Sequence, residues 1–186
     1  LERAVNERML LHLHSNGLLP EHQSAYRRSH STETALLKVT SDALIAADMG
    51  KLTLLGMLDL SAAFDCVDHS ILLGRLEVSF GFGGAVLDWM RSYLVGRRQY
   101  IRYNGLTSST TVVQFGVPQG SVLGPLFFIL YTADVFHIAE ELGFYIHGYA
   151  DDLQLYDHCL ACDTAQLSVR LAHCIEVMGQ WMSSNR

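Results

Sequence analysis

Apolar residues recur about every three or four positions in several parts of the chain, which is the spacing of one face of an α-helix. The first such pattern opens the sequence and stops at Asn16-Gly17, a typical helix end. Ser31 or Thr32 can cap a second helix that runs to about Asp48. The inner face of this second helix comprises Ala35, Leu36, Val39, Ala43 and Ala46.

Further helices are predicted downstream, each with a signal at one end. Asp68 suits the N-cap of a short helix, and Gly96 closes another that begins near Leu87. Pro125 stands where a helix can start, because proline fits the first helical turn. The apolar face of the last helix comprises Leu167, Leu171, Cys174, Met178 and Trp181.

Apolar runs too short for a helix predict strands. One run, 52–58, ends in Asp59. Two others, 144–146 and 153–156, meet at Asp151-Asp152 and predict a β-hairpin with an acidic turn. Acidic residues therefore stand at the ends of these predicted strands.

A β-ribbon is predicted by segments 98–103 and 110–114, which flank the turn signal Asn104-Gly105. The order of elements predicts an α+β fold, with helices against one face of an antiparallel sheet. The length of 186 residues, 49% of them hydrophobic, suits one domain or part of one. Because the sequence opens on Leu1 and closes without a cap or tail, we expect an excerpt of a longer polypeptide.

The net charge of −6 contrasts with the basic footprint that is usual for proteins that bind nucleic acid. Such basic segments are therefore expected outside this excerpt. The dense basic cluster inside it comprises Arg91, Arg97, Arg98 and Arg102. No long uncharged apolar stretch and no signal-peptide pattern occurs, which predicts an intracellular setting with no secretion signal and no membrane contact.

The four cysteines are expected to be reduced thiols. Cys159, Cys162 and Cys174 with His173 could be ligands of a zinc ion. However, Cys174 belongs to the apolar face of the last helix, and the adjacent His173 would point about 100° away from it. Structural roles fit these residues better.

Asp59, Asp151 and Asp152 are the candidate chemical site. If the strands of Asp59 and of the hairpin are neighbours, the three carboxylates converge at one edge of the sheet. Adjacent acids are costly unless a cation offsets them, and their hard oxygen ligands suit Mg²⁺. A pair of such ions predicts an in-line reaction at phosphorus. The alternative is a solvated acidic turn with Asp59 as a helix cap.

A glycine-rich segment, 116–130, separates these acids and joins a loop to a helix. In order and spacing, three segments resemble motifs A, B and C of a reverse transcriptase: 58–69, 116–121 and 149–152. The sequences of segments 23–27 and 31–34 are similar to those of non-LTR (LINE-type) retrotransposon polymerases. The resemblance covers the chain from about Leu1 to Arg186.

This resemblance implies the palm of a right-hand polymerase plus part of the fingers, with the thumb absent. Residues 1–186 would form a single partial domain, with the fingers part at about 1–50. The palm, with an inserted fingers-like segment, would occupy about 51–186. The implied activity is that of an RNA-directed DNA polymerase that copies retrotransposon RNA into DNA, although the isolated chain is expected to be inactive.

The resemblance also assigns the acids. Asp59 and Asp151 would hold two Mg²⁺ ions, or Mn²⁺, with Asp152 supporting them from the same turn. Leu60 would add a backbone carbonyl to this metal site.

Other residues acquire roles beside the nucleotide and the nucleic acid. Phe64 occupies the position of the aromatic that excludes a ribose 2′-hydroxyl, although a plain core aromatic is the alternative. Gln119 and Gly120 would lie along the incoming nucleotide and the template base. Candidate nucleic-acid contacts are Arg27, Arg28, Arg97 and Arg98.

The implied partners are an RNA template, a DNA primer, deoxynucleoside triphosphates and the remainder of a parent polyprotein with an endonuclease and a thumb. The implied location is the nucleus at integration and the cytoplasm as a ribonucleoprotein. One alternative is a group II intron-type reverse transcriptase, which shares Tyr-Ala-Asp-Asp. Another is a catalytically inactive relic or repurposed nucleic-acid-binding fragment. The Gly-Asp-Asp motif usual in viral RNA polymerases differs from the sequence around Ala150.

Overall fold

The computed structural model describes residues 1–60 and 62–185. The chain forms two compact units, each built from segments distant in sequence. The sheet unit comprises Leu19–Ala63 and Thr132–Ser184, and the helical unit comprises Leu1–Leu18, Phe64–Tyr131 and Asn185. The division that we expect at about residue 50, between fingers and palm parts, stays a prediction.

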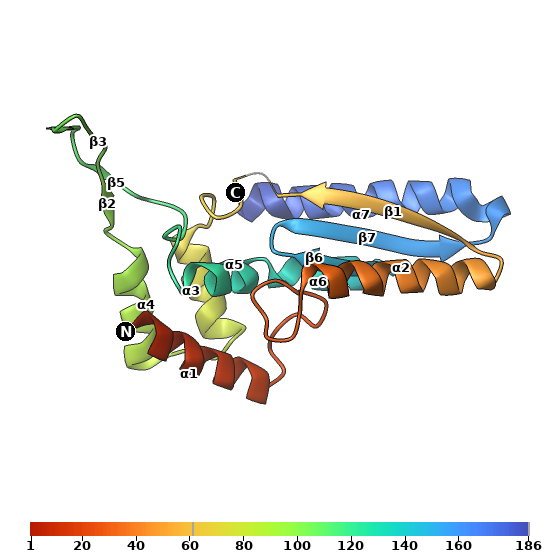
Figure 1. Ribbon diagram of the computed structural model, residues 1–186, viewed down its shortest axis with the longest axis horizontal. Coiled ribbons are helices and arrows are strands. Elements are labelled where there is room, and N and C mark those ends of the chain that lie inside the picture. The colour runs from red at the N-terminus through yellow and green to blue at the C-terminus, as the bar shows by residue number, and fades with distance from the viewer. Residues whose placement is uncertain (61, 186) are drawn as a thin grey trace. The chain divides into compact units, whose positions relative to one another are not determined.

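The sheet unit is built on three antiparallel strands in the order β1-β7-β6 (Figure 1). The strands are β1 (Leu52–Asp59), β6 (Tyr145–Tyr149) and β7 (Asp152–Cys159). β1 pairs along the whole of β7, while β6 and β7 form a hairpin whose connection is Ala150-Asp151. The predicted strand and acidic hairpin are confirmed.

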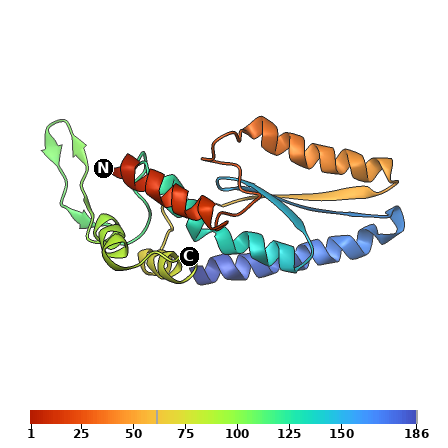
Figure 2. The same ribbon diagram turned by 90° about the horizontal axis from the view of Figure 1, so that it is seen from below.

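Helices cover both faces of this sheet (Figure 2). α2 (Thr32–Asp48) lies on one face, and α6 (Ala133–Glu141) and α7 (Thr164–Asn185) lie on the other, α7 being preceded by the 3₁₀ turn η1 (Ala161–Asp163). The predicted antiparallel α+β class is confirmed, but the prediction that helices cover only one face of the sheet was wrong. The reason is that neighbours on β7 are buried on opposite sides, Leu155 toward the α6–α7 core and Tyr156 toward α2.

A hydrophobic core of the sheet unit lies between the strands and α6 and α7. It comprises Val135, Phe136, Ala139, Phe144, Ile146, Leu153, Leu155, Leu167, Leu171, Cys174 and Met178. The predicted apolar face of the last helix is therefore confirmed, and burial raises the pKa of the Cys174 thiol. The helix α6 was not expected from the sequence, because its apolar positions follow directly after those of the helix that ends at Tyr131.

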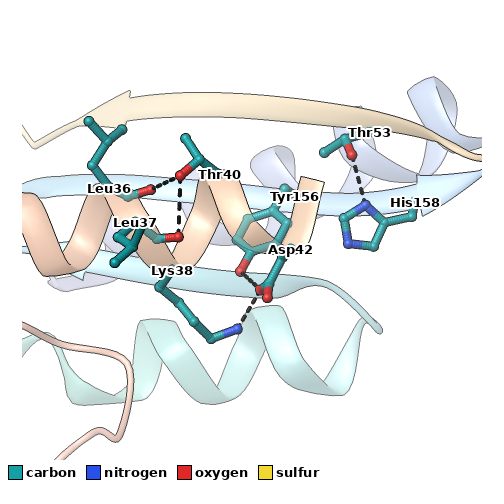
Figure 3. Close-up of polar contacts among 8 residues, drawn as sticks. All are labelled: Leu36, Leu37, Lys38, Thr40, Asp42, Thr53, Tyr156 and His158. Carbon is teal, nitrogen blue, oxygen red and sulfur yellow. Dashed lines mark hydrogen bonds and ion pairs between the residues drawn. The ribbon is translucent and has the colours of Figure 1, made fainter. Parts of the chain in front are cut away.

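α2 is fixed to the sheet by polar contacts as well as apolar ones (Figure 3). The Tyr156 hydroxyl donates to the Asp42 carboxylate at 2.6 Å, and Lys38 donates to the same carboxylate. Burial alone would raise the pKa of Asp42, but these two hydrogen bonds lower it overall. Burial, followed by the bond to Asp42, raises the pKa of Tyr156. Leu36, which we expected on the inner face, is 58% exposed.

The helical unit contains α1 (Glu2–Ser15), α3 (His69–Val78), α4 (Gly84–Leu94) and α5 (Gly124–Tyr131). Its fully buried side chains include Leu13, Leu72, Leu76, Met90, Leu94, Leu123, Phe127 and Leu130. Asp68 caps α3, as predicted, by accepting hydrogen bonds from the amides of Ser70 and Ile71. None of the helices in residues 1–60 and 62–185 is long and apolar enough to cross a membrane.

The predicted ribbon of the helical unit is confirmed as two short paired sections, drawn in green beyond α4 in Figure 1. Its base pairs β2 (Arg98–Gln99) with β5 (Thr111–Val112), and its tip pairs β3 (Arg102–Tyr103) with β4 (Leu106–Thr107). Asn104 and Gly105 form the turn with φ of 46° and 78°, which suits a tight hairpin.

Candidate active site

Asp59 and Asp152 meet at the end of the sheet. Asp59 is the last residue of β1, Asp152 is the first of β7, and they are paired directly across the two strands. Both side chains are exposed. Like charges directly opposite one another destabilise a sheet unless a cation lies between them.

Asp151 belongs to the two-residue connection before β7 and is half-buried. Its backbone carbonyl accepts a hydrogen bond from the Leu60 amide at 3.2 Å, so the end of β1 is tied to the turn. The three acids therefore share one edge of the sheet, as expected. Their side chains are less closely gathered than we expected, because among the described residues no three or more His, Cys, Asp or Glu side chains form a ready metal cluster.

A cavity of about 450 Å³ opens beside the acids on the α2 side of the sheet. Its lining comprises Thr32, Ala35, Leu36, Met57, Leu58, Asp59, Tyr149, Asp152, Leu153 and Gln154. The donor chemistry fits Mg²⁺, which binds one or two carboxylates and completes its shell with waters and substrate phosphates. Asp59 and Asp152 together could supply these two carboxylates.

Tyr26 is a neighbour of the acidic turn that no sequence pattern indicates. It has a left-handed φ of 57° and a largely exposed side chain. Burial and then the negative charge of Asp151 raise the pKa of the Tyr26 phenol. A phenolate at this position would therefore be disfavoured by both burial and the charge of Asp151.

Phe64 lies in the helical unit, where its ring stacks on Phe128 with 4.6 Å between ring centroids. It is half-buried, so one side of the ring contacts the core. The Phe64 carbonyl accepts from the Val117 amide at 2.9 Å, and the Val67 carbonyl accepts from the Gly116 amide at 2.8 Å. Backbone hydrogen bonds thus join the segment after Asp59 to the glycine-rich loop.

Gly116 is required at this junction. It has a φ of +80°, and an added Cβ would lie 3.0 Å from backbone atoms of Phe64 and Asp65. Gln119 donates from Nε2 to the Asp65 carboxylate at 3.0 Å, which gives Asp65 a structural partner. Gly120 has a φ of +77° with open space around it. Phe64, Gln119 and Gly120 therefore belong to one connected loop system.

Two of the four candidate arginines are engaged in backbone contacts. Arg27 donates to the carbonyls of Pro20, Glu21 and Gln23, and Arg97 donates to those of Leu94 and Gly116. Burial lowers the pKa of Arg97. Arg28 and Arg98 are exposed. These contacts give Arg27 and Arg97 a role in holding loops together.

A family model described as reverse transcriptase (RNA-dependent DNA polymerase) matches residues 1–186. The chain belongs to the reverse transcriptase family. Reverse transcriptases generally use divalent metal ions, which agrees with the donor chemistry of the acidic edge.

Curated relatives of this reverse transcriptase chain come from Drosophila transposable elements. The probable RNA-directed DNA polymerase from transposon BS of Drosophila melanogaster is 32% identical over 88% of the chain, and that from the X-element is 36% identical over 72%. The polymerase from the mobile element jockey of Drosophila funebris is 31% identical over 82%. The chain spans 18%, 14% and 17% of these three proteins.

Solved telomerase structures share the fold of this reverse transcriptase chain. Apo telomerase from Candida tropicalis gives a TM-score of 0.66 at 14% identity and covers 96% of the chain and 35% of the telomerase. Telomerase from Candida albicans, in complex with a fragment of telomeric RNA, also gives 0.66 at 16% identity, covering 90% and 32%. The expected polymerase-type fold is confirmed.

Proposed function

We propose that this reverse transcriptase chain carries the catalytic carboxylates of an RNA-directed DNA polymerase that copies retrotransposon RNA into DNA. The observation that carries the proposal is the pairing of Asp59 with Asp152, which lie beside the turn of Asp151 and line a cavity. The transposon relatives support an RNA template from a non-LTR element. The substrates would be deoxynucleoside triphosphates and a DNA primer.

Asp59 and Asp151 would hold two Mg²⁺ ions, or Mn²⁺, with Asp152 as a supporting ligand and the Leu60 carbonyl as a further donor. When bound, such ions activate a primer 3′-hydroxyl and neutralise the charge of the triphosphate. The carboxylates would fix where the attacking and leaving oxygens lie. The pairing of Asp59 with Asp152 supports a cation at this edge of the sheet, because these side chains otherwise repel one another.

Phe64, Gln119 and Gly120 would select and seat the nucleotide. The stacking of Phe64 on Phe128 supports a rigid ring, which is what exclusion of a 2′-hydroxyl requires. The open space around Gly120 supports close approach of a base or sugar. Gln119 would lie beside them, held by its bond to Asp65.

The ribbon of the helical unit would contact the template–primer duplex. Residues 89–133 carry four arginines and no aspartate or glutamate, although the chain as a whole has a net charge of −6. Within the ribbon, Arg98 and Arg102 are exposed beside Tyr100 and Tyr103, which are 58% and 74% exposed. Arginines that bind phosphates and aromatic rings that stack on bases are typical of nucleic-acid surfaces. We propose that Arg98 and Arg102 contact the phosphates, and that Arg97 holds the ribbon in place through its backbone contacts.

In this proposal the endonuclease and thumb belong to the remainder of the parent polypeptide. The enzyme would act in the nucleus at integration and travel in the cytoplasm as a ribonucleoprotein. A primer-extension assay tests the activity, using an RNA template, a DNA primer and a version of the chain extended at both ends in its own reading frame. RNA-templated DNA synthesis that requires Mg²⁺ or Mn²⁺ is expected. Failure of the extended protein to elongate the primer with either ion would contradict the proposal.

A further inference from the structure

Residues 22–25 of the sheet unit run alongside β6, next to the acidic turn. The Gly148 amide donates to the His22 carbonyl and the Ser24 amide donates to the Gly148 carbonyl, each at 2.8 Å. These bonds add a short parallel bridge to the edge strand. Gln23, between the two bonded residues, has an exposed fraction of 0%. A buried amide needs hydrogen-bond partners, and Gln23 finds them in the turn.

The side chain of Gln23 binds both backbone polar groups of Ala150. Its Oε1 accepts from the Ala150 amide at 3.0 Å, and its Nε2 donates to the Ala150 carbonyl at 3.1 Å. Ala150 immediately precedes Asp151 and has a left-handed φ of 58°, which is unfavourable for a residue with a side chain. The unfavourable conformation is therefore held by a side chain from outside the hairpin.

The surroundings hold Gln23 in this place. An added Cβ on Gly148 would lie 3.0 Å from Gln23 Nε2 and 2.6 Å from a ring carbon of Phe136, so glycine is needed there. The Ala25 amide donates to Gln23 Oε1 at 3.0 Å. The Arg27 guanidinium donates to three carbonyls of the loop, including that of Gln23 at 3.1 Å.

We propose that Gln23 is a positioning residue for Asp151 and Asp152, an inference that rests on the proposed function of these acids. Gln23 acts through the backbone of Ala150 and has no direct contact role with substrate. Glutamine suits this task because one side chain both donates and accepts. Catalytic carboxylates must be held close to their productive geometry, and a turn fixed in one conformation loses less freedom when an ion binds.

Hydrogen exchange measured by NMR on the 186-residue chain tests the hold on the turn. Gln23→Met keeps similar bulk but removes the donor and the acceptor, whereas Gln23→Glu keeps an acceptor for the Ala150 amide. We expect exchange of this amide to be at least about 10-fold faster in the Met variant, with a smaller increase in the Glu variant. The exposed Gln180→Ala is the control and should match the wild type.

Amides of α7 in the same spectra report whether each variant remains folded, and they should exchange at the wild-type rate. Titration with Mn²⁺, followed by broadening of the resonances of residues 148–152, measures the consequence for the acids. We expect Gln23→Met to bind Mn²⁺ several-fold more weakly. Unchanged exchange at Ala150 overturns the proposal, and so does faster exchange with an unchanged Mn²⁺ affinity.

Asp151→Asn separates this inference from the proposed function. It should abolish Mn²⁺ broadening at the turn while leaving exchange of the Ala150 amide protected, because the Gln23 bonds involve only backbone atoms of Ala150. If Asp151→Asn binds Mn²⁺ as the wild type does, the metal assignment fails. The effect of Gln23→Met on Ala150 exchange would in that case still show whether Gln23 holds the turn.

Discussion

Asp59 and Asp152 are direct cross-strand partners, and the next pair inward is Leu58 with Leu153. Leu153 is 2% exposed and belongs to the core, so the two carboxylates stand where the apolar interior ends. Two acids in such a pair repel one another, by several tenths of a kcal/mol in typical sheets. A local arrangement that lowers stability is expected where function requires it.

Asp59→Asn and Asp151→Asn should each abolish primer extension by the extended protein. Losing one carboxylate removes charge stabilisation at the attacking and leaving oxygens, which costs on the order of 100-fold or more in rate. Without metal, Asp59→Asn should leave the melting temperature of the 186-residue chain unchanged or slightly higher, since it relieves repulsion with Asp152. Extension rates and thermal unfolding measure the two effects.

The matched control is Glu176→Gln, which removes one exposed acid from α7. It should change neither extension nor stability. An Asp59→Asn protein that retains more than a few per cent of the activity would refute the metal assignment.

Phe64→Ala should admit ribonucleotides by opening space beside the sugar, while incorporation of deoxynucleotides falls less. The structure adds a cost, because the stacking contact with Phe128 is lost, worth about 0.5–1.5 kcal/mol. Phe128→Ala is the comparison, since it removes the same contact but keeps the Phe64 ring, and it should relax the selection for deoxynucleotides less than Phe64→Ala does. The measurement is the ratio of kcat/KM for a ribonucleotide and a deoxynucleotide. An equal change of this ratio in both variants would make Phe64 a core aromatic only.

The placement of the acids could be predicted from sequence because strand periodicity and turn signals are local. The runs before Asp59 and around Asp151 are short and apolar, and a tight hairpin brings its two ends together. The cap at Asp68 and the ribbon turn at Asn104 are equally local. Each of these predictions depends on residues within a few positions of one another.

Contacts between distant segments could not be predicted in the same way. The bonds between Gln23 and Ala150 join residues 127 positions apart, and no spacing in the sequence indicates them. On the second helix-covered face, the hydrogen bond from Tyr156 to Asp42 likewise links residues 114 positions apart. The engagement of Arg97 with Gly116 likewise depends on tertiary structure, and it leaves Arg98 as the exposed member of the pair.

Arg98→Ala combined with Arg102→Ala should weaken binding of an RNA–DNA duplex by the extended protein. If each arginine neutralises one phosphate, the slope of log affinity against log salt should become shallower by about 1 per arginine. Arg3→Ala combined with Arg8→Ala is the control, because it removes the same charge from exposed positions on α1. Fluorescence anisotropy over a series of salt concentrations measures both slopes. Equal slopes for the two double variants would remove the ribbon from the nucleic-acid interface.

The sheet unit should lose stability as the pH falls below about 6.5, the ordinary value for histidine, because of His147. His147 is buried on β6, and its Nε2 is hydrogen-bonded to the Ser24 hydroxyl at 2.9 Å. Its Nδ1 is buried with no hydrogen-bond partner among the described residues. A protonated ring would carry a second buried N–H donor in need of a partner.

The direction of the effect follows from the pKa. Burial lowers the pKa of His147, and the positive charges of His22, Lys38 and His30 lower it further, against an opposing effect of Asp42. The folded state therefore favours the neutral ring. Its contribution is fully present above the unfolded pKa and is lost as the pH falls through the folded one.

Thermal unfolding measured at about pH 7.5 and at about pH 5.5, on either side of the ordinary pKa of histidine, tests the prediction. The wild type should lose more stability between them than His147→Gln, which cannot titrate in this range. His173→Gln, at an exposed position on α7, should follow the wild type. Because Ser24 belongs to the loop that carries Gln23, acid should also lower the protection factor of the Ala150 amide, which compares its exchange rate with the intrinsic rate at the same pH. The same pH dependence in wild type and His147→Gln would show that another group is responsible.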